Sequence, residues 1–150
     1  MRKLLVLLSL SLFSLGLSAR DAPTVHGCAT DGIAVGGYDL VSYHQDGGPV
    51  PGSIDQAEEL GGLRYLFSTA ANRDLFRADP ERYLPTYQGW CAATLAMGRL
   101  ACPDYTNFKI EKGRLLLFEL AGFTNGRSLW NSDPAGFRER ADANFKKLVK

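Results

Sequence analysis

Short strand-like and helix-like segments alternate irregularly along this chain, separated by glycine and proline. The segments with the β-branched, aliphatic or aromatic content of strands cover residues 33–35, 40–43, 63–67, 108–110 and 115–118. Gly113 lies between the last two segments and supplies the positive φ that a hairpin turn needs. Residues 45–53 are rich in glycine and proline and are expected to form a loop.

Most helix signals also mark short elements. Ser68 and Thr69 offer N-cap oxygens for a first helix. Asp79 followed by Pro80 marks a second helix start, because the missing N–H of proline costs nothing at the first helical position. Residues 89–97 are apolar and predict a third short helix that is buried.

The C-terminal segment gives the clearest helix signal. Asp133 can cap this helix and Pro134 can open it. Its apolar residues recur at the spacing of one helical face: Phe137, Ala141, Phe145 and Leu148. Short strands and short helices in irregular order indicate an α+β domain. We expect one small antiparallel sheet packed with short helices and this C-terminal amphipathic helix.

The N-terminal segment has the features of a secretory signal peptide. Arg2 and Lys3 precede an apolar run that ends in small residues and is too short to be a convincing membrane span. We expect a signal peptide over residues 1–19, an irregular arm over 20–32 and a single domain over 33–150. The protein is then exported, either periplasmic or secreted, with no membrane span after cleavage.

The charge balance argues against one class of partner. The whole chain has 17 Lys and Arg against 16 Asp and Glu, for a net charge of +1. Loss of Arg2 and Lys3 with the signal peptide would change the net charge to −1. A nearly neutral chain lacks the long-range field that attracts nucleic acid. We therefore expect no nucleic-acid partner.

Three cysteines remain after this cleavage: Cys28, Cys91 and Cys102. An exported compartment is oxidising, so one disulfide is expected, and the third cysteine would be a free thiol or a metal ligand. Three pairings are possible, and the sequence spacing does not choose among them.

Several motifs occur together between residues 33 and 145. They are Gly37-Tyr38-Asp39-Leu40-Val41-Ser42-Tyr43, Tyr65-Leu66-Phe67-Ser68, Phe76-x-x-Asp79-Pro80-x-x-Tyr83-x-Pro85-x-Tyr87-x-Gly89-x-Cys91-Ala92, Gly113-x-Leu115-x-Leu117, and a terminal helix with Trp130, Ala141 and Asp142. In combination they resemble the YHS domain family in its longer exported form. The resemblance implies an α+β domain associated with metal, because short YHS domains and the similar TRASH domains look like cysteine-based modules of copper and heavy-metal transport proteins.

The chain departs from the metal-type pattern of that family. The pattern places one cysteine directly after the strand aromatic and a second one within the next helix. After Phe67 this chain has Ser68-Thr69-Ala70-Ala71-Asn72, without cysteine. Serine and asparagine are poor ligands for soft metals, which prefer thiolate and imidazole. Cys91 is the one family cysteine that this chain retains.

Cys91 is the first candidate for chemistry because it lies near the start of the helix expected over residues 89–97. Backbone N–H groups at a helix N-terminus favour a thiolate. The alternative is a small buried residue, or half of a disulfide with Cys102. His44 follows Tyr43 at the end of a predicted strand and could be a ligand, a base or a solvated loop residue.

Aromatic residues near these groups could line a pocket. Tyr43, Tyr87 and Trp90 are the candidates, although such residues more often pack in cores with the hydroxyl bonded to backbone. The chain lacks Gly-x-Ser-x-Gly, His-Glu-x-x-His, phosphate-loop and Cys-x-x-Cys motifs. No enzyme class is therefore predicted from a motif.

The leading hypothesis is an exported YHS-like module that binds a transition metal, copper or zinc, in the cell envelope. Cys91 would anchor the metal, His44 would assist, and Cys102 or Cys28 would come third. The first alternative is a thiol-dependent enzyme or redox protein that uses Cys91. The second is a structural or interaction domain without a cofactor. The partner would be a metal ion or an envelope protein.

Overall fold

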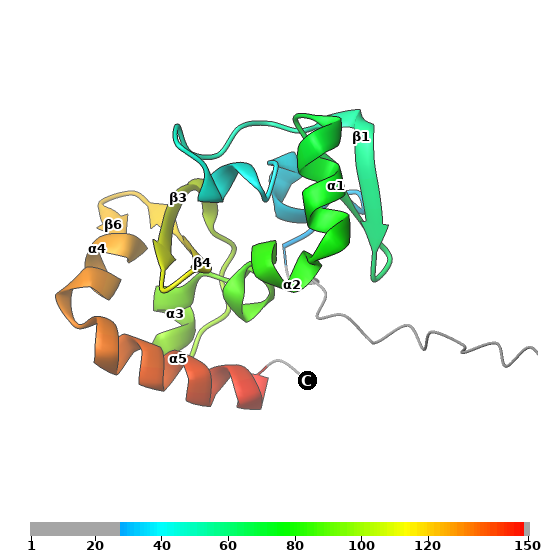
Figure 1. Cartoon of the computed structure of the whole chain (residues 1–150). Helices are drawn as coiled ribbons and strands as arrows, with labels where there is room; N and C mark the ends of the chain where they lie inside the picture. The colour runs from blue at the N-terminus through cyan, green and yellow to red at the C-terminus, as the bar shows by residue number, and fades with distance from the viewer. Residues whose placement is uncertain (1–27, 149–150) are drawn as a thin grey trace, which may run out of the picture.

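The computed structural model describes residues 28–148 and has the predicted α+β fold (Figure 1). In this part of the chain, six strands form three two-stranded antiparallel sheets, accompanied by five α-helices. The strands are β1 (Ser53–Leu60), β2 (Leu63–Phe67), β3 (Asp104–Glu111), β4 (Arg114–Phe118), β5 (Leu120–Ala121) and β6 (Thr124–Asn125). The helices are α1 (Ala70–Ala78), α2 (Pro80–Tyr83), α3 (Ala92–Ala96), α4 (Gly126–Ser132) and α5 (Pro134–Leu148). The expected signal peptide, residues 1–19, and residues 20–27 of the expected arm lie outside the described residues.

The strands do not form the single sheet that we predicted. β1 pairs with β2, β3 with β4, and β5 with β6. The hairpin around Gly113 is confirmed, with Glu111 opposite Arg114. The sequence did not predict β1, because its residues are mostly polar and its side chains stay exposed or half-buried. Its conformation depends on pairing with the buried strand β2.

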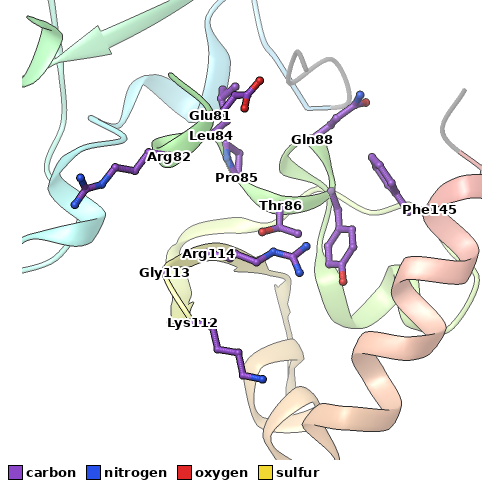
Figure 2. A pocket seen from close by; sticks show the side chains of 11 residues that line it. Glu81, Arg82, Leu84, Pro85, Thr86, Gln88, Lys112, Gly113, Arg114 and Phe145 are labelled. Carbon is purple, nitrogen blue, oxygen red and sulfur yellow. The ribbon is translucent and has the colours of Figure 1, made fainter. Parts of the chain in front are cut away.

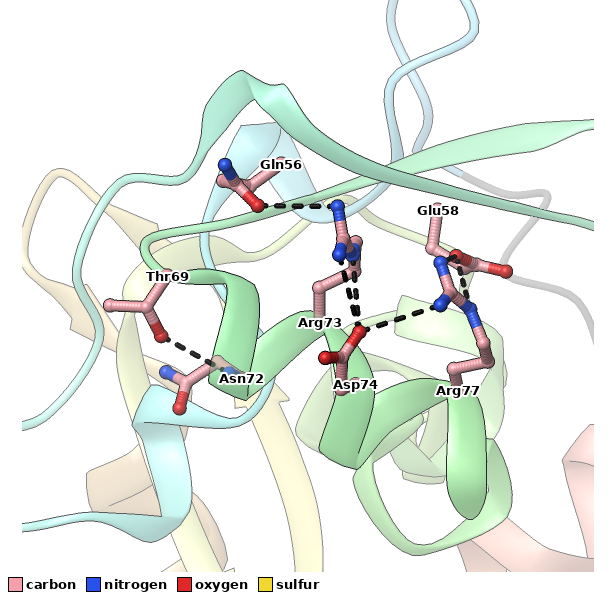
Figure 3. A network of polar contacts seen from close by, with 7 residues as sticks. All are labelled: Gln56, Glu58, Thr69, Asn72, Arg73, Asp74 and Arg77. Atoms are coloured by element: carbon pink, nitrogen blue, oxygen red, sulfur yellow. Dashed lines mark hydrogen bonds and ion pairs between the residues drawn. The ribbon is translucent and has the colours of Figure 1, made fainter.

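Polar side chains on α1 connect this helix to β1 (Figure 3). The guanidinium of Arg77 pairs with the Glu58 carboxylate at 2.6 Å, and that of Arg73 donates to Gln56 Oε1 at 3.3 Å. Asp74 accepts from both arginines at 3.3–3.4 Å. Exposed pairs of this kind contribute little stability each, at most about 1 kcal/mol. They explain how a polar strand keeps its place beside the helix.

Residues 33–35 and 40–43 are not strands, so this prediction was wrong. They lie in or beside two 3₁₀ turns, Ala34–Gly37 and Ser42–His44. The Asp39 carboxylate accepts the backbone N–H of Val41 at 2.9 Å, which removes that donor from any strand ladder.

Asp39 is a fully buried carboxylate that joins three separate segments. It is 0% exposed. Besides the N–H of Val41 it accepts the N–H of Ser42 at 3.4 Å, the N–H and hydroxyl of Ser68 at 2.9 and 2.6 Å, and the side-chain amide of Asn72 at 2.7 Å. Ser68 and Asn72 therefore lie at one hydrogen-bond centre just after β2.

The predicted helices are present, with one changed start. Thr69 caps α1 by accepting the N–H of Asn72 at 3.1 Å, and Asp133 accepts the N–H of Gly136 at 3.0 Å at the start of α5. The helix predicted over residues 89–97 is shorter, because α3 begins only after its N-cap, Cys91.

Two hydrophobic clusters form the core, and β4 lies between them. Leu115 and Leu117 belong to the cluster under β2 and α1, whereas Leu116 and Phe118 belong to the cluster with α3, α4 and α5. Successive strand residues point to opposite faces. Because both faces of β4 are buried, four consecutive positions of this strand are apolar.

One disulfide closes a long loop of the chain. Cys28 is bonded to Cys102 across 74 residues of sequence, with Cα atoms 5.5 Å apart. The Tyr105 hydroxyl donates to the carbonyl of Cys28 at 2.9 Å. These contacts hold the start of the described chain against the beginning of β3.

Candidate functional site

The disulfide decides among the pairings that the sequence left open. Cys28 and Cys102 are oxidised together, so neither offers a thiolate as a third metal ligand in this state. Cys91 is free and buried. The alternative pairing of Cys91 with Cys102 is therefore wrong.

Cys91 lies at the start of a helix, as predicted, but inside the second hydrophobic cluster. Its side chain is 0% exposed. The sulfur accepts the backbone N–H of Glu119 at 3.1 Å and that of Thr94 at 3.5 Å. The thiol thus caps α3 and binds the chain between β4 and β5. No external group reaches it without local opening.

We predict that Cys91 resists alkylation in the folded protein. Iodoacetamide labelling followed by mass spectrometry should show little modification of Cys91 under native conditions and full modification in denaturant, because a thiolate must be accessible to react. A matched variant, Ser132→Cys, places a thiol on the exposed end of α4 and should react in both conditions. Equal native labelling of Cys91 and of this surface thiol would contradict the burial.

His44 contacts the first hydrophobic cluster, whereas Cys91 belongs to the second. Its ring packs edge-on against Tyr83, a member of the first hydrophobic cluster, with centroids 5.5 Å apart. Its Nε2 atom is buried and has no hydrogen-bond partner among the described residues. Burial lowers the pKa of His44, and the nearby charge of Arg82 lowers it further.

The expected metal site has no complete ligand set in the described structure. Within residues 28–148, no group of three or more His, Cys, Asp and Glu side chains is placed to hold a metal ion. The pair of Cys91 and His44 as metal ligands stays a prediction.

The lowered pKa of His44 predicts acid-sensitive stability. The unfolded chain binds a proton near the ordinary histidine pKa of about 6.5, whereas the folded protein binds it only at lower pH. The contribution of neutral His44 to the free energy of unfolding should therefore be fully present above about pH 6.5. It should be lost as the pH falls through the folded-state pKa.

Urea unfolding of the wild type and of His44→Phe tests this prediction. The measurements are made at several pH values, from about 7.5 down to values below the ordinary histidine pKa. The difference in stability between the two proteins should shift in favour of the variant as the pH falls, because phenylalanine has no proton to bind. Every other titrating group is shared by both proteins and cancels. Parallel pH profiles would contradict the prediction.

A cleft of about 470 Å³ opens where four separate elements meet (Figure 2). Its walls come from α2 and the turn that follows it, from the β3–β4 turn, and from α5. The lining includes the non-polar side chains of Leu84, Pro85 and Phe145 and the polar side chains of Thr86 and Gln88. The cleft thus has both non-polar and polar walls.

Tyr87 forms part of this cleft in an unusual backbone conformation. Tyr87 and Gln88 have φ values of 63° and 53°, in the left-handed region that residues other than glycine rarely adopt. The Tyr87 hydroxyl donates to Asp142 Oδ1 at 2.9 Å, and its ring packs on Phe145 with centroids 5.6 Å apart. Strained residues of this kind persist only where the surrounding structure holds them. Here α5 holds them.

The electrostatics around the Tyr87 hydroxyl combine both signs of charge. Burial raises the pKa of Tyr87, and the hydrogen bond to Asp142 raises it further. The positive charges of Arg114 and Arg138 act in the opposite direction on the pKa of Tyr87. Arg114 is therefore close enough to Tyr87 to influence the pKa of its hydroxyl.

The three predicted pocket aromatics lie in different places. Tyr87 lines the cleft. Tyr43 is a core residue whose hydroxyl donates to the carbonyl of Tyr105 at 2.8 Å, and burial raises its pKa. Trp90 is half-buried and does not line the cleft. Sequence reasoning missed Arg114, which also lines the cleft.

Comparison with protein-family models, with curated proteins and with solved structures gives no match to this chain. The resemblance to the YHS family therefore stays a prediction from the sequence motifs. Among the described residues, no helix has the length and apolar character to cross a membrane.

Proposed function

We propose that this protein is an exported binding module whose ligand site is the cleft beside Tyr87. The proposal rests on this cleft. Segments far apart in the sequence meet there and line it with both non-polar and polar side chains. Ligand sites are typically concave and mostly non-polar, with a few placed polar groups. The strained backbone at Tyr87 and Gln88 adds support, because such strain clusters at ligand sites.

Export is part of the proposal. The charged start and apolar run of residues 1–19 are typical of a signal peptide, and the disulfide between Cys28 and Cys102 is consistent with an oxidising compartment. A binding role also agrees with the absence of enzyme motifs from the sequence and with the burial of Cys91. No observation on the described residues favours the metal or thiol alternatives over the cleft.

A fragment screen by two-dimensional NMR tests this proposal. Small fragments of all charge types are added to the purified protein, and shifts of assigned amide resonances locate any binding. We expect the shifts to concentrate on residues 84–88 and 112–114. Thr86→Trp should fill the cleft and abolish them, whereas the same substitution at Thr124, on β6, should not. Shifts that survive Thr86→Trp, or a screen without cleft binders, would contradict the proposal.

A further inference from the structure

Arg114 faces the cleft without a partner among the described residues. It lies directly opposite Glu111 across the β3–β4 hairpin, where an ion pair would be expected. However, the Glu111 carboxylate pairs with Lys109 at 3.0 Å and with Arg138. Within residues 28–148 the Arg114 guanidinium has no ion pair and no hydrogen bond.

Other charges of the cleft do not neutralise this guanidinium. The acidic lining residue Glu81 comes from α2, and its carboxylate points away from Arg114 (Figure 2). Asp142, just outside the lining, accepts the hydroxyl of Tyr87 and forms no ion pair with Arg114 in the described part of the chain. Lys112 comes from the same turn as Arg114 and adds a second cation on that side, again without an ion pair in the described part of the chain. Positive charge therefore predominates on the β3–β4 side of the cleft.

The position of Arg114 suits one kind of recognition. In Figure 2 the Arg114 side chain extends into view from the β4 side of the cleft and passes below Thr86. A guanidinium presents a planar fork of donors that matches a carboxylate in a two-point contact. The non-polar part of the lining comes from Leu84 and Pro85, beside the turn after α2, and from Phe145 of α5. A ligand that uses both walls carries one carboxylate and a flat or compact hydrocarbon part.

We propose that the cleft binds small organic carboxylates, with the carboxylate on Arg114 and the hydrocarbon part against Phe145 and Pro85. This inference rests on the proposed binding role of the cleft and specifies its ligand class. Lys112 contributes long-range attraction from the same side, and Thr86 offers a hydroxyl beside the carboxylate. An inorganic anion would use only the charged wall and should bind more weakly.

A set of probes with the same ring and different charge tests the inference. The probes are benzoate, benzamide and benzylamine, with acetate and inorganic phosphate as anions that lack the ring. Binding is measured on the purified full chain by NMR titration of cleft resonances. We expect benzoate to bind at least about tenfold more tightly than benzamide, because a hydrogen bond to a charged group is worth more than a neutral one. Acetate and phosphate should bind more weakly than benzoate.

Matched variants separate the role of Arg114 from general charge. Arg114→Gln should reduce benzoate affinity to that of benzamide and leave benzamide unchanged. Arg64→Gln removes the same charge from an exposed position of β2 and should leave both affinities unchanged. Arg114 is exposed, so its replacement should preserve the amide spectrum and the fold.

The outcomes distinguish this inference from the proposed function. If benzamide or benzylamine binds in the cleft as tightly as benzoate, or if Arg114→Gln leaves benzoate affinity unchanged, the carboxylate inference fails and the binding role stands. If acetate or phosphate binds as tightly as benzoate, the assigned role of the non-polar wall fails. If no probe or fragment of any charge shifts the cleft resonances, the inference and the proposed function fail together.

Discussion

Replacing Asp39 with alanine is expected to lower the free energy of unfolding by about 4 kcal/mol. The buried carboxylate accepts five hydrogen bonds that join the Ser42–His44 turn, the end of β2 and the start of α1. Its removal leaves several buried donors without an acceptor, and each unsatisfied group costs about 1–3 kcal/mol. Urea unfolding followed by circular dichroism measures the loss.

Asp46 provides the matched control for this prediction. It lies on an exposed loop close to Asp39 in sequence, and Asp46→Ala should change stability by no more than about 0.5 kcal/mol. Asp39→Asn keeps the size of the side chain but replaces one acceptor oxygen with a donor, so it should also destabilise, though less than alanine. Equal unfolding midpoints for Asp39→Ala and Asp46→Ala would show that the hydrogen-bond centre is not important for stability.

Loss of the disulfide is expected to have a similarly large effect. Cross-linking residues 74 apart in sequence restricts the unfolded chain, and the chain-entropy model gives about 4 kcal/mol for a loop of this length. The double variant Cys28→Ala, Cys102→Ala should therefore unfold at a markedly lower urea concentration than the oxidised wild type. The comparison is made at equal protein concentration and pH.

A reducing agent provides the control for the disulfide prediction. Reductant should lower the unfolding midpoint of the wild type toward that of the double variant and should leave the double variant unchanged. Cys91 is a free thiol in both proteins, so its contribution cancels. A reduced wild type that is as stable as the oxidised protein would contradict the prediction.

The candidate site was only partly predictable. The motif around Tyr87 contains the turn that lines the cleft, and the hairpin around Gly113 was predicted correctly. The sequence did not show that this turn and this hairpin face each other across a cleft, together with Phe145 of α5. That arrangement depends on contacts between residues far apart in the chain. Periodicity and local propensity carry no information about such contacts.

The assignment of chemistry to Cys91 and His44 illustrates the same limit. Residue type alone made both attractive ligands, but packing places the sulfur in one hydrophobic cluster and the imidazole against Tyr83 of the other. Arg114 drew no attention in the sequence. It becomes notable only because Lys109 and Arg138 occupy the carboxylate of Glu111 opposite it.

Local signals in the sequence determined the α+β class, the β3–β4 hairpin, and the cap and apolar face of α5, because these depend on residues within a few positions of each other. Tertiary structure alone decided the division into three small sheets, the pairing of Cys28 with Cys102, and the cleft beside Tyr87. The physical reason is that a burial position, a disulfide partner or an unpaired charge is set by which distant segments pack together.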